Sequence, residues 1–105
     1  VTASGARSHD GGGGIPIGIS EDARYRNEII ALSPGDRVVF YTDGATEAAN
    51  DEDEEFGVDR LLACLSEPSE GGIRAQLRRL NAQIQEFTKP GRLRDDVTMV
   101  GLGLE

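Results

Sequence analysis

One short segment limits the possible folds more than any other. Residues 37–42 contain Val38-Val39-Phe40-Tyr41, an unbroken run of apolar, β-prone side chains that suits a strand covered on both faces. The turn sequence Ser33-Pro34-Gly35-Asp36 precedes it, with Pro presetting the second turn position and Gly accepting the positive φ of the third. We therefore predict a central strand over Arg37 to Thr42, joined by this turn to an antiparallel strand over Glu28 to Leu32.

The remaining apolar patterns predict two helices and one further strand. Apolar residues recur at helical spacing from Val58 to Leu65 and again from Ile73 to Phe87. Alternation over Val97 to Leu104 predicts a last strand, and Thr46 to Ala49 a short helical turn. The expected fold class is α+β, an antiparallel sheet with flanking helices. Residues 15–105 form its body, after a flexible Gly-rich segment over residues 1–14.

Length and composition narrow the function. A chain of 105 residues is at most one small domain with a modest core. The net charge of -8 argues against a nucleic-acid partner, which requires cationic side chains. No apolar run is long enough to cross a bilayer, so we expect no membrane contact by this segment. A single cysteine cannot form an internal disulfide, which fits a reducing, cytoplasmic setting. Because it opens at Val1 without Met, we expect a piece of a longer polypeptide.

Carboxylates flank two of the predicted strands. Asp43 directly follows the central strand, and Asp95 and Asp96 directly precede the last one. If these strands are antiparallel neighbours, Asp43 and Asp95 or Asp96 lie at the same edge of the sheet. Adjacent side chains on an extended chain point to opposite sides, so at most one of the latter pair is expected to bind a cation directly. Hard oxygen ligands favour Mg²⁺ or Mn²⁺ over Zn²⁺.

Other polar features favour structural roles. The acidic run over residues 51–55 lacks the spacing of a calcium loop and is typical of solvated surface. Cys64 lies beside a helical apolar stripe, where a buried small side chain is expected. His9 has no evident partner, and the Gly run over residues 11–14 lacks the Lys and the Ser or Thr of a phosphate-binding loop.

Five sequence blocks carry a resemblance to a known family. They are Gly14-Ile15-Pro16-Ile17-Gly18, Leu32-Ser33-Pro34-Gly35-Asp36, Tyr41-Thr42-Asp43-Gly44-Ala45-Thr46-Glu47-Ala48, Glu55-Phe56-Gly57 and Asp95-Asp96-Val97-Thr98. In this order, the chain from Gly14 to Leu104 resembles the C-terminal part of bacterial protein phosphatase 2C-like domains. The most similar branch is that of stage II sporulation protein E and the sigma-factor regulatory phosphatases.

The resemblance implies a metal-dependent serine/threonine protein phosphatase. Such a domain is a sandwich of two antiparallel sheets flanked by helices, and it holds two Mn²⁺ or Mg²⁺ ions that activate a water toward a phosphoserine or phosphothreonine protein. By resemblance Asp43 and Asp95 match metal ligands, and Asp96 matches the neighbouring, often supporting position. The implied substrate is a small regulatory protein such as an anti-anti-sigma factor. The family's first metal-binding block has no counterpart here, so we expect an incomplete two-metal site and little activity from this chain alone.

A second hypothesis comes from a different class of function. A half-domain leaves a sheet face, a strand edge or a helix stripe exposed, and such surfaces favour association. The chain would then be a non-catalytic interaction module that pairs with the missing half or forms a homodimer through the exposed sheet or helix face.

Overall fold

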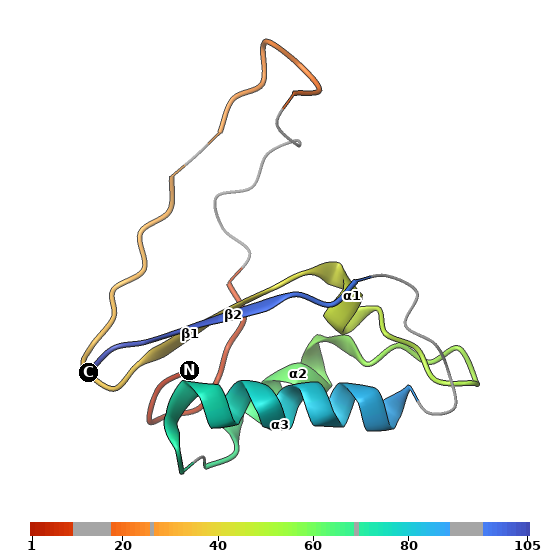
Figure 1. Cartoon of the computed structure of the whole chain (residues 1–105). Helices are drawn as coiled ribbons and strands as arrows, with labels where there is room; N and C mark the ends of the chain where they lie inside the picture. Colours follow the sequence, from red (N-terminus) through yellow and green to blue (C-terminus); the bar gives the residue numbers. More distant parts are fainter. Residues whose placement is uncertain (10–17, 26, 69, 89–95) are drawn as a thin grey trace.

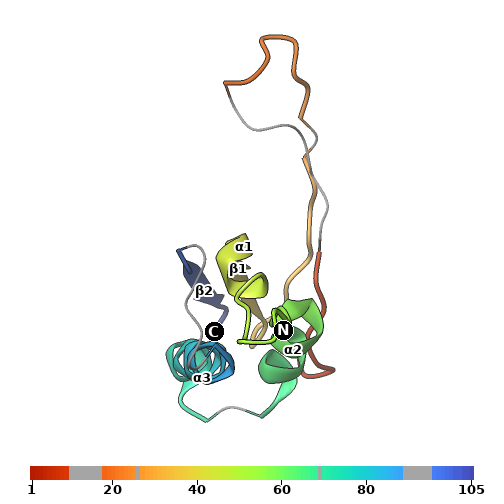
Figure 2. The same cartoon turned by 90° about the vertical axis from the view of Figure 1, so that its right-hand side faces the viewer.

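In the residues that the structure describes, the fold is an α+β arrangement of one small sheet and three helices. The computed structural model describes residues 1–9, 18–25, 27–68, 70–88 and 96–105. Its elements, in chain order, are β1 (Arg37–Tyr41), α1 (Asp43–Thr46), α2 (Gly57–Ser66), α3 (Gly72–Phe87) and β2 (Met99–Gly103). The two longer helices lie side by side below the strands (Figures 1 and 2). The predicted fold class is therefore confirmed.

The strands β1 and β2 form an antiparallel pair. Arg37 lies opposite Gly103 at one end of the ladder, and Tyr41 lies opposite Met99 at the other. Both predicted strands are present, although each is slightly shorter than the sequence indicates, and the pairing meets the condition under which Asp43 and Asp96 share an edge. The end of β1 therefore lies beside the start of β2.

The turn that precedes β1 forms as predicted. The amide of Asp36 donates to the carbonyl of Ser33 at 3.0 Å, and the amide of Ser33 donates to Oδ2 of Asp36 at 2.8 Å. Gly35 has a φ of 90°, which explains glycine at the third position. The amide of Gly35 donates to the carbonyl of Leu104 at 2.8 Å, so the turn binds the end of β2.

The predicted strand over Glu28 to Leu32 is wrong. Residues 27–32 are extended but are not part of a strand, and Ile29 is 94% exposed. A strand is stabilised by ladder hydrogen bonds to a neighbour, and this arm rises away from β1 (Figure 1). The β-prone residues of the arm have no ladder partner among the described residues.

The prediction that β1 is covered on both faces is also wrong. On one face, Val39, Tyr41 and Met99 pack against the core beside α2 and α3. On the other face, Phe40 is 61% exposed, Val100 57% and Leu102 52%. We call these three residues the uncovered face. The described residues provide only one helical layer, and no second layer lies on the other side of the sheet (Figure 2).

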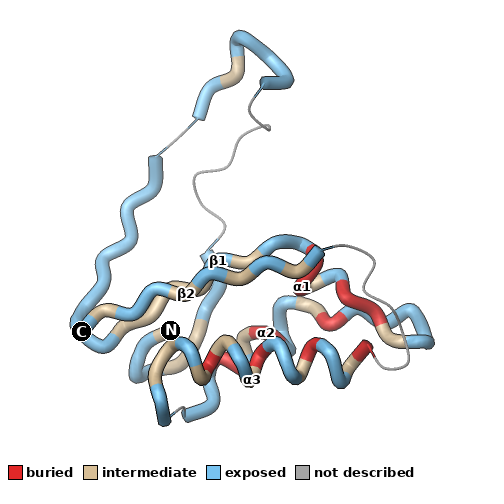
Figure 3. Tube along the Cα trace, viewed as in Figure 1, coloured by how far each residue is buried: buried red, intermediate tan, exposed pale blue. Residues whose placement is uncertain are grey.

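Both longer helices follow the predicted apolar stripes. Leu61 and Leu65 of α2 and Leu80 and Ile84 of α3 are at most 4% exposed and form the centre of the core. Figure 3 shows the buried residues concentrated where these helices meet and next to α1. Burying such side chains is the main favourable term in the fold.

The short helix was predicted in the wrong place, at Thr46 to Ala49. Helix α1 begins at Asp43, with Thr42 between it and the end of β1, because the amide of Ala45 already donates to the carbonyl of Thr42 at 3.0 Å. Ala48 and Ala49 are instead buried and non-helical. The carbonyl of Ala48 accepts from the amide of Phe56 at 2.7 Å, and Ala49 forms a bridge with Glu55.

A buried glutamine connects the sheet to both helices. Gln76 of α3 is 1% exposed, its Nε2 donates to the carbonyl of Leu65 at 2.8 Å, and its Oε1 accepts from Nη1 of Arg37 at 2.9 Å. Arg79 donates to the carbonyls of Cys64, Glu67 and Pro68, and so satisfies groups at the end of α2. These polar contacts fix how α2, α3 and β1 meet.

The N-terminal residues contact this body. The amino group of Val1 donates to the carbonyl of Arg37 at 2.7 Å, and the amide of Ala6 donates to Oγ of Ser66 at 3.0 Å. The Gly run over residues 11–14 lies outside the described residues, so the flexibility of residues 1–14 stays a prediction. In the described part of the chain, no helix combines the length and the apolar character needed to cross a membrane.

Candidate metal-binding edge of the sheet

The end of β1 and the segment before β2 meet at one edge of the sheet. Asp43 begins α1 two residues after the end of β1, and Asp96 lies three residues before Met99. The amide of Thr42 donates to the carbonyl of Thr98 at 3.1 Å, which holds the two segments together. Asp43 and Asp96 are therefore brought to the same edge, while Asp95 lies outside the described residues.

The carboxylate of Asp43 is exposed at this edge. Its backbone carbonyl accepts from the amide of Glu47 at 2.8 Å and from Oγ1 of Thr46 at 3.3 Å, which fixes the first turn of α1. The next two residues of α1, Gly44 and Ala45, are buried, which fixes the helix against the core. No described residue hydrogen-bonds to the Asp43 side chain. The Asp43 carboxylate is thus exposed and remains a candidate ligand.

Thr42 is a residue of this edge that the sequence analysis did not identify. Its Oγ1 donates to the carbonyl of Asp96 at 3.2 Å and accepts from the amide of Thr98 at 3.1 Å. A hydroxyl at the last position of a strand, directly before Asp-Gly, was the available signal. The Thr42 side chain fixes the Asp96 backbone against the start of α1.

The donor chemistry of the edge fits a hard divalent cation, because carboxylate oxygens are the protein ligands that Mg²⁺ and Mn²⁺ prefer. Within the described ranges, no group of three or more His, Cys, Asp or Glu residues is arranged to hold a metal ion. The described residues of this edge thus provide Asp43 and Asp96 as candidate oxygen ligands.

The acidic run over residues 51–55 forms an exposed turn. Oδ1 of Asn50 accepts from the amides of Glu52 and Glu54 at 3.0 and 2.9 Å, and Asp53 adopts a φ of 59°. A side-chain hydrogen bond with Glu54 and repulsion from its charge raise the pKa of Glu52. Because residues 51–55 are all exposed, the prediction of a solvated acidic surface is confirmed.

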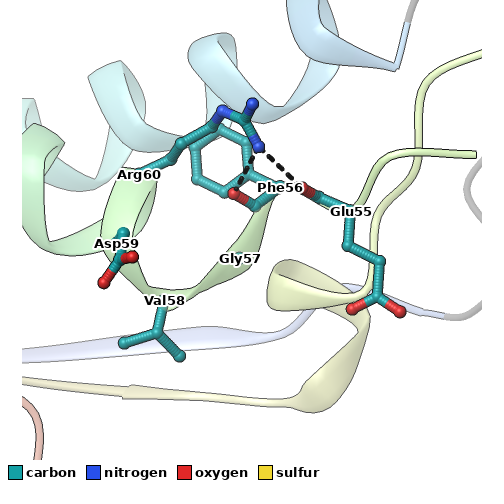
Figure 4. Close-up of a pocket in the computed structure, with 6 residues that line it drawn as sticks. All are labelled: Glu55, Phe56, Gly57, Val58, Asp59 and Arg60. Carbon is teal, nitrogen blue, oxygen red and sulfur yellow. Dashed lines mark hydrogen bonds between the residues drawn. The ribbon is translucent and has the colours of Figure 1, made fainter. Parts of the chain in front are cut away.

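An open pocket lies at the start of α2 (Figure 4). Nη1 of Arg60 donates to the carbonyls of Glu55 and Phe56 at 2.7 and 3.1 Å, and the guanidinium lies 4.5 Å from the centre of the Phe87 ring. Phe56 and Phe87 pack edge to face at 5.5 Å. Gly57 follows with a φ of 79°. The block Glu55-Phe56-Gly57 therefore connects the loop to α2 and α3. The guanidinium of Arg60 is already bound by the two carbonyls and the Phe87 ring.

Neither of the other candidate nucleophilic or basic side chains contributes a site. Cys64 is 1% exposed, and burial raises the pKa of its thiol, which favours the unreactive neutral form. The prediction of a buried small side chain is confirmed. His9 is exposed.

Comparison with known proteins identifies the family. The family model for stage II sporulation protein E (SpoIIE) matches residues 1–105, the whole chain. Searches of curated proteins and of solved structures gave no match. The α+β fold and the antiparallel pairing of β1 with β2 agree with the resemblance stated from the sequence. The chain belongs to the SpoIIE family, a family of phosphatase domains of the protein phosphatase 2C type.

Proposed function

We propose that the protein carrying this chain is a metal-dependent serine/threonine protein phosphatase. The observation that supports it best is the exposed Asp43 carboxylate at the edge where Thr42 holds the Asp96 segment. Asp43 and Asp95 are the proposed ligands, with Asp96 as a ligand or as support for Asp95. The assignment of Asp95 rests on its place in the sequence.

The proposed cofactors are Mn²⁺ or Mg²⁺, with a further part of the metal cage supplied from outside the described residues. When bound, such ions lower the pKa of a water and neutralise charge on phosphoryl oxygens. In this proposal, the pairing of β1 with β2 brings the segments that contain Asp43 and Asp96 to one edge, and the buried Gly44 and Ala45 fix α1 against the core. The proposed substrate is a phosphoserine or phosphothreonine regulatory protein in the cytoplasm, such as an anti-anti-sigma factor.

Phosphate release from a phosphoserine protein in Mn²⁺ tests this proposal on the full-length protein that carries the chain. We expect Asp43→Asn to lower the rate at least about tenfold, because a neutral amide binds a hard cation more weakly than a carboxylate. Asp59→Asn is the matched control, since Asp59 is an exposed carboxylate on α2 and is not one of the proposed ligands. Equal rates for the two variants, or full activity in a chelator, would show that the proposal is wrong.

A second candidate function is self-association, which is favoured by the uncovered face. Phe40, Val100 and Leu102 are adjacent apolar side chains on one side of the sheet. The same chain carries an unpaired apolar arm, with Ile29 94% and Ile30 46% exposed. We propose a second copy of this chain as the occupant, because each copy offers both an apolar face and an apolar extended segment.

Sedimentation velocity over a range of chain concentrations tests self-association. We expect a concentration-dependent dimer that strengthens with salt, since a net charge of -8 on each copy opposes association at low ionic strength. Phe40→Ser should shift the chain to monomer, whereas Val58→Ser, at a partly exposed position on α2, should not. A wild-type chain that stays monomeric at every concentration would exclude this function.

A further inference from the structure

We infer that Thr42 is a positioning residue, whose hydroxyl sets where Asp96 lies relative to Asp43. The inference rests on the proposed function, because the separation of these carboxylates matters only if they bind a common cation. It adds a residue to the site that is not itself a proposed ligand.

The argument begins with the way the β-ladder ends. In a regular hydrogen-bonded antiparallel pair, the two residues exchange two N–H to C=O bonds. At Thr42 and Thr98 the first bond is regular, from the amide of Thr42 to the carbonyl of Thr98 at 3.1 Å. The second differs, because the amide of Thr98 donates to the side-chain Oγ1 of Thr42 at 3.1 Å.

The carbonyl of Thr42 is used elsewhere. It accepts from the amide of Ala45 at 3.0 Å, which starts the first turn of α1. The hydroxyl therefore takes the place of the carbonyl in the ladder, and the chain enters α1 at Asp43 while Thr98 remains bound. Thr42, between the end of β1 and the start of α1, therefore accepts the first hydrogen bond of the helix and keeps Thr98 paired with it.

The hydrogen of the same hydroxyl fixes Asp96. Oγ1 of Thr42 donates to the carbonyl of Asp96 at 3.2 Å, so both the donor and an acceptor site of the hydroxyl are used on one segment. Asp43 is the next residue after Thr42. The hydroxyl thus links the backbone of Asp96 to the residue that precedes Asp43. Because a small displacement of its ligands weakens the binding of a metal ion, this link bears on the site.

Amide hydrogen exchange of the metal-free chain, measured by NMR, tests the hydrogen bonds themselves. Thr42→Val keeps the shape and the β-branched side chain but removes the hydroxyl, and Thr42→Ser keeps the hydroxyl. We expect exchange at Thr98 to rise at least about tenfold in the valine variant and to stay near the wild-type rate in the serine variant. Amides of α3 are the internal control. Unchanged exchange at Thr98 in Thr42→Val would overturn the inference.

A Mn²⁺ titration of the same variants tests the positioning role. Paramagnetic broadening of the Asp43 and Asp96 amide signals should require several-fold more Mn²⁺ in Thr42→Val than in wild type, and Thr42→Ser should restore the response. Equal Mn²⁺ responses with faster exchange at Thr98 would reduce Thr42 to a structural role and overturn the inference. No broadening at Asp43 in the wild type would instead contradict the proposed metal site, and with it any positioning toward a cation.

Discussion

The Leu80→Ala variant is expected to lose about 2–5 kcal/mol of the free energy of unfolding. Leu80 is 0% exposed at the middle of α3, in the same core cluster as Leu61, Leu65 and Ile84. Truncation removes apolar contacts and leaves a cavity that the surrounding helices fill only in part. Small domains have total stabilities of about 5–15 kcal/mol, so this loss is a large share of the whole. Urea unfolding followed by far-UV circular dichroism measures it.

Leu62→Ala is the matched control for this prediction. Leu62→Ala is the same chemical change on α2, but Leu62 is only partly buried at the border of the core. We expect it to cost clearly less than Leu80→Ala, because part of its side chain already contacts water. Equal losses for the two variants would contradict the placement of Leu80 at the centre of the core.

Gly101→Ala is expected to destabilise the chain by about 1–3 kcal/mol, although it adds a single methyl group. A Cβ at this position would lie 2.5 Å from Cγ1 of Ile73 and 2.9 Å from Cδ1 of Leu77. Both side chains belong to α3, so the helix packs on β2 at a distance that only glycine permits. The methyl group would force α3 away from the strand, and the same unfolding measurement would detect the loss.

Gly103→Ala provides an equivalent substitution on the same strand. Its Cβ would lie 3.9 Å from Cγ2 of Ile73, which is ordinary van der Waals contact. We expect its effect to stay within roughly 0.5 kcal/mol of wild type. If Gly103→Ala were as destabilising as Gly101→Ala, the close packing at Gly101 would not be the cause.

Local patterns were sufficient to predict the two longer helices and the positions of β1 and β2. The stripes that begin at Val58 and Ile73 match α2 and α3, because a helix that covers one face of a sheet needs apolar residues on one side only. The turn at Ser33 to Asp36 has the geometry that its Pro-Gly pair indicates. Asp43 follows one predicted strand and Asp96 precedes the other. If the two strands are antiparallel neighbours, these residues must lie at the same edge of the sheet.

Features that depend on partners in space were not predictable in the same way. The arm over residues 27–32 has the composition of a strand, yet strand formation also requires a neighbour to complete its hydrogen bonds. The structural role of Gln76 was not predicted, because it depends on hydrogen bonds with Arg37 and with the carbonyl of Leu65, which are distant in sequence. Thr42 carries its role through a hydroxyl that bonds residues 54 and 56 positions further along the chain.

The uncovered face has a thermodynamic consequence for any partner that docks on it. Phe40, Val100 and Leu102 keep most of their surface in water, so their hydration contributes to the heat capacity of the folded chain. Covering them removes that hydration and gives a negative heat-capacity change on binding. The enthalpy of association should therefore become steadily more negative as the temperature rises, so that calorimetry at several temperatures can recognise binding at this face before the complex itself has been seen.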